Sequence, residues 1–156
     1  MLQSKSKSIL IRSLILVTIS SAIFSFSAKF GGDVFEIYLN NKLISQQFVT
    51  RHEAVKTLQL DQSVSDALVI VKYSHCGVTG TARHIILKDE NNAVVKEWTF
   101  ADAKDNDNNM SCKVKDILAL KNSYGSKFNL YYSSKELPGG RLIASVVVNT
   151  DTKRSS

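Results

Sequence analysis

The strongest constraint on the fold of this chain is the alternation of apolar and polar residues in short segments. In residues 33–39, Phe35, Ile37 and Leu39 fall on one face. A period of two is the pattern of a half-buried β-strand. Further segments rich in apolar or β-branched residues follow at 68–73, 82–88, 93–100, 127–133 and 141–149. Short strands at intervals of about 8–12 residues are typical of an antiparallel β-sandwich or a partly closed barrel.

The first hairpin is predicted from the two asparagines at residues 40–41. Asparagine tolerates the positive φ angles that tight hairpin turns require. A two-residue turn at this place would pair Ile37 with Ile44. The return strand, residues 42–49, then places Ile44 and Phe48 on the core side.

Two more hairpins and one helix are predicted further along the chain. Residues 89–92, Asp-Glu-Asn-Asn, form the turn of the second hairpin, and residues 137–140, Leu-Pro-Gly-Gly, contain the proline and glycine of a type II turn in the third. Helical spacing of apolar residues indicates one short helix near 114–121. The closing strand, 142–148, is expected to be central or covered, because an exposed apolar edge would recruit other chains.

The composition agrees with one folded domain. Of the 156 residues, 44% are hydrophobic and 22% are charged, which is ordinary for a globular protein and too apolar for a disordered one. We therefore expect a single all-β domain over residues 28–149, followed by a flexible polar tail at 150–156. Its predicted architecture is an antiparallel β-sandwich, Ig-like or jelly-roll-like, with about seven to nine strands and the one short helix.

The first 27 residues have the three parts of a secretory signal peptide. A start with three basic residues precedes an apolar stretch, and the small residues Ser25 and Ser27 favour cleavage after Ser27. The stretch from Leu14 to Phe26 is shorter than the roughly 20 residues that a spanning helix needs. We expect a cleaved leader, export to the periplasm or the exterior, and no membrane insertion after cleavage.

The net charge gives no indication of a nucleic-acid partner. The formal charge is +6, but three of the 20 basic residues lie in the predicted leader. The other basic residues are spread along the chain and are nearly balanced by the 14 acidic ones. Nucleic-acid-binding domains normally show a basic stripe or a strongly basic surface, so we expect no nucleic-acid partner.

The two cysteines, Cys76 and Cys112, are predicted to form a disulfide. An exported protein with an even number of cysteines most simply pairs them. The bridge would close a loop of about 37 residues, which the chain-entropy model values at roughly 4 kcal/mol. Both cysteines lie at the ends of predicted strands, where partners can meet.

Two chemical alternatives to the disulfide stay open. The first is a copper site, because copper prefers imidazole and sulfur donors and the sequence offers His75, Cys76, His84, Met110 and Cys112. The second is a nucleophilic Cys76 with His84 or His52 as base, since a reactive thiolate needs an electropositive neighbourhood. The donor spacings match no known metal fingerprint, and no carboxylate is identifiable that would orient the base.

Residues 102–109 faintly resemble a calcium-binding loop. Asp105, Asp107 and Asn109 fall at the first, third and fifth places of such a loop. The place that requires glycine is occupied by Met110, and aspartate stands where the closing glutamate belongs. A solvated loop between strands explains the same residues.

Three runs of the sequence carry a resemblance to known proteins. They are residues 73–77 (Tyr-Ser-His-Cys-Gly), residues 98–102 (Trp-Thr-Phe-Ala-Asp) and residues 130–138 (Leu-Tyr-Tyr-Ser-Ser-Lys-Glu-Leu-Pro), with Arg141 after them. This pattern resembles a group of short exported proteins of Gram-negative bacteria, and the similarity covers most of the mature chain. The resemblance implies export and a compact β domain, and it implies no functional residues.

The sequence offers little for catalysis to use. It has three histidines, no paired carboxylates at a recognisable spacing and no glycine-rich phosphate loop. We expect a non-enzymatic protein of the cell envelope or exterior, without a cofactor, that binds or scaffolds a protein or glycan ligand. The alternative from another class is a thiol- or copper-binding periplasmic protein centred on Cys76.

Overall fold

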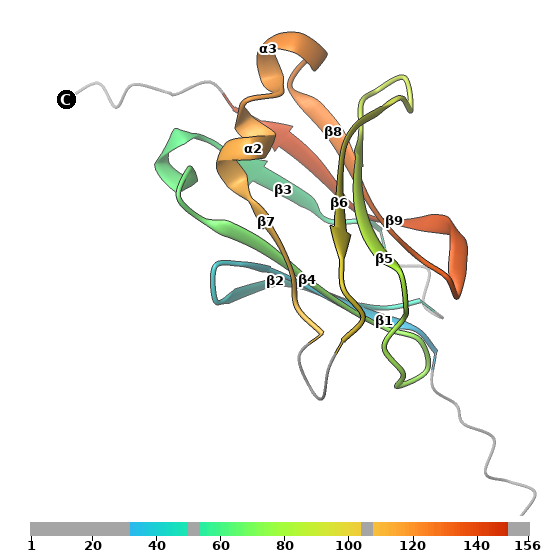
Figure 1. Ribbon diagram of the computed structural model, residues 1–156. Helices are drawn as coiled ribbons and strands as arrows, with labels where there is room; N and C mark the ends of the chain where they lie inside the picture. The colour runs from blue at the N-terminus through green and yellow to red at the C-terminus, as the bar shows by residue number, and fades with distance from the viewer. Residues whose placement is uncertain (1–31, 50–53, 104–107, 150–156) are drawn as a thin grey trace, which may run out of the picture. The chain divides into compact units, whose positions relative to one another are not determined.

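The computed structural model describes residues 32–49, 54–103 and 108–149. They form two β-sheets packed face to face (Figure 1), so the predicted β-sandwich is confirmed. The leader predicted for residues 1–27 and the tail predicted for 150–156 lie outside the described residues. Among the helices of the described ranges, none is long and apolar enough to cross a membrane.

The first sheet has four strands in the order β2-β1-β4-β7. Every neighbouring pair in it is antiparallel. The strands are β1 (Val34–Leu39), β2 (Lys42–Phe48), β4 (Leu68–Ser74) and β7 (Met110–Lys113).

The second sheet has five strands in the order β3-β9-β8-β5-β6. Its strands are β3 (Thr57–Leu60), β5 (Arg83–Lys88), β6 (Val94–Phe100), β8 (Lys127–Ser134) and β9 (Leu137–Val148). The closing strand β9 lies between β3 and β8, and its central position is therefore confirmed. The pairing of β3 with β9 is parallel and departs from the predicted all-antiparallel arrangement. A parallel pair needs a long crossover, and here the chain builds five further strands between the two partners.

Three short helical segments connect the strands: η1 (Gln62–Val64), α2 (Val114–Leu118) and α3 (Lys121–Tyr124). The helix predicted near 114–121 is confirmed by α2 and α3. Helical spacing directs Val114, Ile117 and Leu118 into the core. Helix α3 ends at Gly125, whose φ of 88° lies in the region that glycine adopts at little cost.

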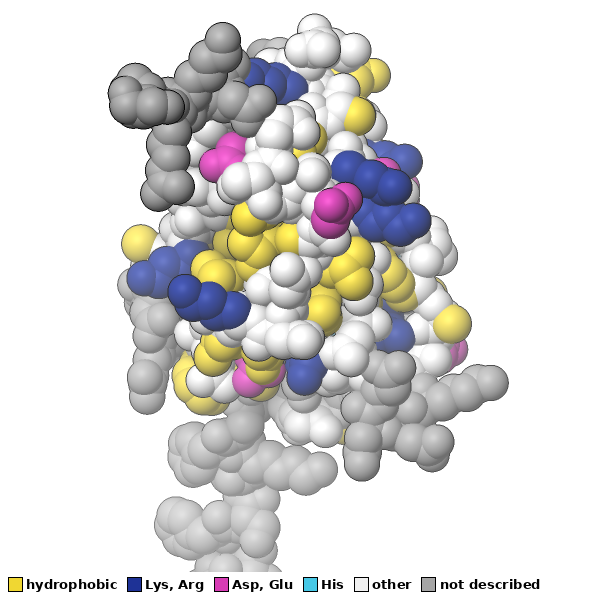
Figure 2. Space-filling model, turned by 90° about the vertical axis from the view of Figure 1, so that its left-hand side faces the viewer, with side chains coloured by type: hydrophobic (Ala, Val, Ile, Leu, Met, Phe, Trp, Pro, Cys, Tyr) yellow, Lys and Arg dark blue, Asp and Glu magenta, His cyan; other side chains and the backbone are white. Residues whose placement is uncertain are grey.

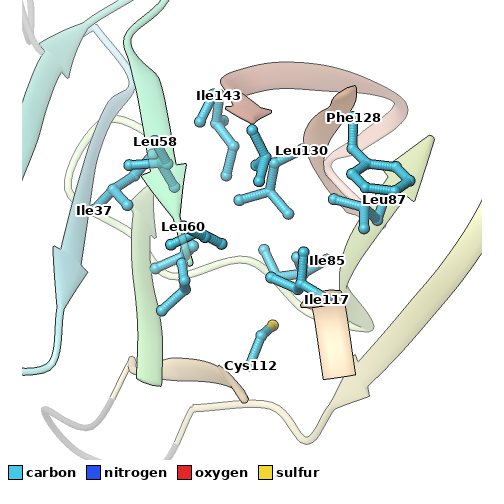
Figure 3. Packing of buried hydrophobic residues seen from close by; sticks show 14 of the residues in the cluster. Ile37, Leu58, Leu60, Ile85, Leu87, Cys112, Ile117, Phe128, Leu130 and Ile143 are labelled. Atoms are coloured by element: carbon cyan, nitrogen blue, oxygen red, sulfur yellow. The ribbon is translucent and has the colours of Figure 1, made fainter. Parts of the chain in front are cut away.

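The core lies between the two sheets and is built from alternate residues of the strands. Buried and partly exposed residues alternate along β4, β5 and β8, as strand geometry requires. Figure 3 shows apolar side chains from both sheets, together with Ile117 of α2, converging on one interior. Burying each large aliphatic side chain contributes about 1.5–3 kcal/mol, so this interior supplies the main driving force for the fold.

The first hairpin turns at residues 40–41 as predicted, but its register is different. A β-bulge between Ile37 and Tyr38 pairs Ile37 with Ser45 and not with Ile44. Side chains alternate along a strand, so a shift of one residue moves the rest of the strand to the opposite face. Simple alternation could not reveal the extra residue.

The shift changes which residues of β2 face the core. Ser45 and Gln47 are buried, Ile44 is only partly buried, and Phe48, predicted to lie in the core, is 42% exposed. Gln47 Nε2 donates a hydrogen bond to the carbonyl oxygen of Ala54 at 2.8 Å. The hydroxyl of Ser45 has no hydrogen-bond partner among the described residues.

The third hairpin turns earlier than predicted. Its turn is at residues 135–136, Ser134 pairs with Leu137, and β9 already contains Pro138. The type II turn predicted at Pro138 is therefore wrong. Proline has no N–H to donate and is tolerated because β3 pairs only with the far end of β9. Gly140, with a φ of 66°, allows the irregular pairing that follows.

Replacement of Ser45 tests the corrected register. Ser45→Ala should raise the free energy of unfolding by about 1 kcal/mol, because it removes a buried hydroxyl that has lost water without gaining a partner. Urea denaturation followed by circular dichroism measures the change. Ser111→Ala, on the exposed face of β7, is the matched control and should be nearly silent. In the register predicted from alternation Ser45 would be exposed. Its replacement would then change the free energy of unfolding as little as the control does.

Candidate functional site

Several side chains that can take part in acid–base or nucleophilic chemistry meet where β1 begins and where β4 and β8 end. We call this group the His75 cluster, and its members are Asp33, Tyr73, His75, Tyr132 and Ser134. Asp33, Tyr73 and His75 come from the first sheet and its flanks, and Tyr132 and Ser134 come from β8 of the second sheet. The cluster therefore combines two of the sequence runs, 73–77 and 130–138, that carry the resemblance.

The imidazole of His75 connects the two sheets. Its Nδ1 lies 3.3 Å from Oδ2 of Asp33, and its Nε2 lies 3.1 Å from both the Tyr132 hydroxyl and the Ser134 hydroxyl. A neutral imidazole that donates from Nδ1 to the carboxylate accepts at Nε2. In this tautomer both hydroxyls of β8 face one acceptor, and the Ser134 hydroxyl also has a hydrogen bond with the carboxylate of Glu136.

Stacked aromatic rings form the floor of the cluster. The rings of Tyr73 and Tyr132 have centroids 4.0 Å apart and planes 10° apart, and both residues are almost fully buried. The Tyr73 hydroxyl donates to Oδ2 of Asp33 at 2.9 Å. Burial raises the pKa of both phenols, and for Tyr73 the hydrogen bond to Asp33 raises it further. Both phenols therefore stay protonated and act as donors.

The turn after β8 is held by Glu136. Its carboxylate accepts hydrogen bonds from the backbone N–H of Thr81 to Oε2 and from the Thr81 hydroxyl to Oε1, both at 2.9 Å. The N–H of Lys135 donates to the carbonyl of Thr81 at 2.9 Å. Hydrogen bonding, above all from the Thr81 backbone, lowers the pKa of Glu136 to about 2. These contacts fix the turn at residues 135–136 against the loop that contains Thr81.

The loop after β4 lies directly on the cluster at Gly80. A Cβ atom at this position would lie 2.5 Å from the Tyr132 hydroxyl oxygen and 3.0 Å from both Nε2 of His75 and Oε2 of Glu136. Real Cβ atoms do not approach other atoms so closely. A larger residue at this position would displace the Tyr132 hydroxyl from the cluster, so glycine lets the loop approach this closely.

Asp33, His75 and Ser134 have the connectivity of an acid–base–nucleophile triad. Ser134, however, is only 4% exposed, it lies beneath the covered end of the sandwich, and Tyr132 shares its imidazole acceptor. A nucleophile needs space for a reacting atom about 3 Å from its oxygen. The arrangement described here is a polar cross-link between the sheets.

The predicted disulfide between Cys76 and Cys112 is absent, and both residues are free thiols. Cys112 pairs with Val69 near the start of β4, whereas Cys76 follows the other end of that strand at Ser74. The stretch from Val69 to Ser74 alone spans about 16 Å, and a disulfide needs Cα atoms within about 7 Å. Spacing in the sequence could not show that the two cysteines lie at opposite ends of one strand.

The two thiols have different surroundings. Cys112 is fully buried among apolar side chains (Figure 3), and burial raises its pKa to about 12, with the charge of Asp116 adding to the effect. Cys76 is exposed, and its thiol lies 3.9 Å from Oδ1 of Asp33. Only Cys76 is therefore accessible to reagents.

The donors considered for copper do not come together. Met110 and Cys112 are buried on β7, His75 belongs to the cluster, and His84 lies on the outer face of β5 with Nδ1 2.7 Å from Oε1 of Glu97. Within the residues that the structure covers, no group of three or more His, Cys, Asp or Glu side chains could hold a metal ion.

The described residues on either side of the segment considered for calcium contact a buried cation. Asp105 and Asp107 lie outside the described residues, and Asn109 is exposed. Arg83 is 4% exposed and donates hydrogen bonds to the backbone carbonyls of residues 101 and 108, at 3.2 and 3.1 Å. The guanidinium thereby links the backbone at residues 101 and 108.

A polar groove of about 290 Å³ lies on the outer face of the second sheet. Strand register places Thr57, Ser145 and Asn129 in one row across β3, β9 and β8. Lys127 and Glu90 also line the groove and form an ion pair, with Nζ 3.5 Å from Oε1. Sequence reasoning missed this groove because its residues come from strands far apart in the chain.

A smaller apolar cavity of about 80 Å³ lies between the β1–β2 hairpin and β3. Figure 2 views the side of the molecule on which these elements lie and shows hydrophobic side chains gathered in the middle of the face. The apolar side chains that line the cavity are Tyr38, Leu39, Ile44, Leu58, Leu60 and Val69.

Comparisons with known proteins add little to this geometry. No family model matches the chain, and no curated protein matches it. Among solved structures, the extracellular domain of a candidate one-component system from B. thetaiotaomicron aligns with a TM-score of 0.39 and 12% identity. The alignment covers 76% of this chain and 15% of that chain. A likeness at this level establishes no shared function.

The native protein should have one reactive thiol. At pH 8, DTNB should react with Cys76, whereas Cys112 is protected by burial and by a pKa of about 12. Absorbance should report one thiol per native chain and two after denaturation in guanidinium. Cys76→Ser should leave no reactive native thiol, and Cys112→Ser should leave one. If the denatured, unreduced protein releases no thiol, the disulfide exists after all.

Loss of the Glu136 charge should destabilise the fold in a pH-dependent way. The folded-state pKa of about 2 lies below the ordinary value of 4.5, so the ionised carboxylate stabilises the folded state above pH 4.5 and this contribution is lost as the pH falls through about 2. Urea denaturation should show Glu136→Gln less stable than wild type at pH 7, with a difference that shrinks between pH 4.5 and 2.

Glu90→Gln is the matched control, because it breaks only an exposed ion pair of small energetic value. A Glu136→Gln variant as stable as wild type at pH 7 would contradict the role assigned to this carboxylate. A difference that stays constant down to pH 2 would contradict it as well.

Proposed function

We propose that this protein is an exported, non-enzymatic binding domain of the cell envelope or exterior, which holds a protein or glycan ligand on a rigid β-sandwich. The observation that carries the proposal is the polar groove of about 290 Å³ on the outer face of the second sheet. Small-molecule sites are concave and contain a few well-placed polar groups, and this groove has that character.

The rigidity of the groove supports a binding role. Its floor belongs to β8 and β9, and both strands lie between two hydrogen-bonded neighbours near the groove. Pairing on both sides fixes the backbone of these strands, so little backbone freedom is lost when a ligand binds. The groove is thus organised before the ligand arrives.

The contacts and burial of the potentially reactive side chains support a non-enzymatic role. The side chains of the His75 cluster satisfy one another across the sheets, and Ser134 is closed off from solvent. Support for export comes from the leader-like sequence of residues 1–27 and from the resemblance to exported bacterial proteins.

The rival function is thiol or copper binding centred on Cys76. One observation favours it: Cys76 is an exposed free thiol. Met110 and Cys112 are buried on another strand, so a copper site would have Cys76 and His75 as its only nearby donors of the predicted set. The test is titration of the reduced mature protein and of the Cys76→Ser variant with Cu(I). Binding of one equivalent by the wild type but not by the variant would support the thiol or copper function.

Binding without turnover is the direct test of the proposal. The immobilised mature protein is exposed to envelope and medium fractions of the producing cells, and retained components are identified by mass spectrometry and sugar analysis. Calorimetry then measures the affinity for the purified component. We expect saturable binding of a component that is recovered chemically unchanged, with the same affinity for Ser134→Ala and Cys76→Ser.

Two results would contradict the proposal. The first is a component recovered cleaved or modified in a way that depends on Ser134 or Cys76, which would indicate an enzyme. The second is the absence of any saturable ligand in either fraction, which would leave the groove without a role.

A further inference from the structure

We infer that the polar groove on the outer face of the second sheet binds a neutral saccharide, either a short one or the end of a longer glycan. This inference rests on the proposed binding function and names its ligand class. The residues of its lining that are exposed or partly exposed are Thr57, Glu90, Lys127, Asn129, Ser145 and Val147.

The first observation is a row of hydrogen-bonding side chains across three strands. Thr57 lies opposite Ser145 in the parallel β3–β9 pair, and Ser145 lies opposite Asn129 in the antiparallel β8–β9 pair. Neighbouring strands are about 4.8 Å apart, so the three polar groups are spaced at that interval along the groove. A ligand lying across the strands would meet each of them in turn.

The second observation is that these groups are largely uncommitted. The Ser145 hydroxyl donates only a long hydrogen bond of 3.4 Å to Oδ1 of Asn129. Within the described ranges, Asn129 accepts this bond, and the Thr57 hydroxyl makes no hydrogen bond to the protein. Hydroxyl and carboxamide groups both donate and accept, which matches the hydroxyl groups of a sugar.

The third observation is the balance of charge. The groove contains one cation and one anion, Lys127 and Glu90, and they pair with each other at 3.5 Å. The carboxylate of Glu90 offsets the attraction of Lys127 for an anionic ligand, and Lys127 offsets that of Glu90 for a cationic one. The groove therefore favours a neutral ligand.

The fourth observation separates a sugar from an extended peptide. Peptides added to a sheet pair with the backbone of an exposed edge. The floor of this groove is formed by β8 and β9, whose backbone groups at Asn129 and Ser145 are already paired with neighbouring strands. Along this floor only side chains are offered to the ligand, together with the apolar surface of Val147 for the C–H groups of a sugar ring. The edge strand β3 lines the groove only at Thr57.

The size of the groove limits the ligand. Its volume of about 290 Å³ lies at the lower end of the ~300–1,000 Å³ typical of small-molecule pockets. The aromatic ring of Tyr131, next along β8 on the same face, has the Lys88 ammonium 4.5 Å from its centroid and is not a free stacking surface. We expect weak binding of single units that repeated units strengthen.

Affinity gel electrophoresis with polysaccharides tests the inference. The mature protein is run in native gels that contain xyloglucan, laminarin or dextran as neutral probes and polygalacturonate as the anionic comparison. Oligosaccharides of the retarding polysaccharide are then titrated by calorimetry. We expect at least one neutral polysaccharide to retard the protein, and Asn129→Ala and Thr57→Ala each to weaken binding at least tenfold.

Ser133→Ala is the matched control, because Ser133 lies on β8 and on the same face as Asn129 but does not line the groove. Its affinity should stay within twofold of wild type. Circular dichroism melting of each variant separates loss of binding from loss of fold. All three replaced side chains lie on the outer face of the sheet, so we expect melting temperatures close to wild type.

The possible failures are distinguishable. Binding of a neutral polysaccharide that the groove variants do not weaken overturns the assigned site, and retardation by polygalacturonate alone overturns the neutral ligand class. Both results leave the proposed binding function intact. If no polysaccharide retards the protein while a retained protein ligand binds saturably in the capture experiment, the saccharide inference fails alone. If neither experiment yields a ligand, the proposed function fails with it.

Discussion

The hydrogen bonds of the His75 imidazole to both sheets fix how one end of the sandwich is closed. Apolar packing holds the sheets together along their length, but it has no direction and would allow them to slide. His75 adds directional contacts, to Asp33 on one side and to the hydroxyls of β8 on the other. The stacked tyrosines, the close approach of Gly80 and the turn held by Glu136 lie at the same end of the sandwich.

This constraint separates the interior of the molecule from the surface that is available for function. The potentially reactive side chains stabilise the fold, because each is largely buried or satisfied by contacts between strands. They are His75, Ser134 and Cys112. The outer face of the second sheet has the opposite character. Its polar row lies on strands that are already paired, so it is both rigid and open. A stable scaffold with an uncommitted polar face is suited to holding a ligand.

Much of the fold was predictable from local patterns, and much of the site was not. Alternation predicted the sandwich, the turn residues 89–92 predicted the second hairpin, and the apolar character of the closing strand predicted that it would be central or covered. The register of β2 depends on one bulged residue beside Ile37, which leaves no mark in a period-two pattern. The turn at residues 135–136 depends on Thr81, far away in the sequence. The disulfide was inferred from compartment and number, which carry no information on the distance between Cys76 and Cys112.

A double-mutant cycle on His75→Ala and Tyr132→Phe tests most directly whether the His75 cluster is a cross-link between the sheets. Tyr132→Phe keeps the ring stack and removes only the phenol hydroxyl, which is one of the two hydroxyls that face the imidazole. The free energies of unfolding of the four proteins, measured in urea, should show a coupling of about 0.5–3 kcal/mol, so that the loss of the hydroxyl matters in wild type and scarcely matters without His75. Additive effects of the two replacements, or a His75→Ala protein as stable as wild type, would contradict the cross-link.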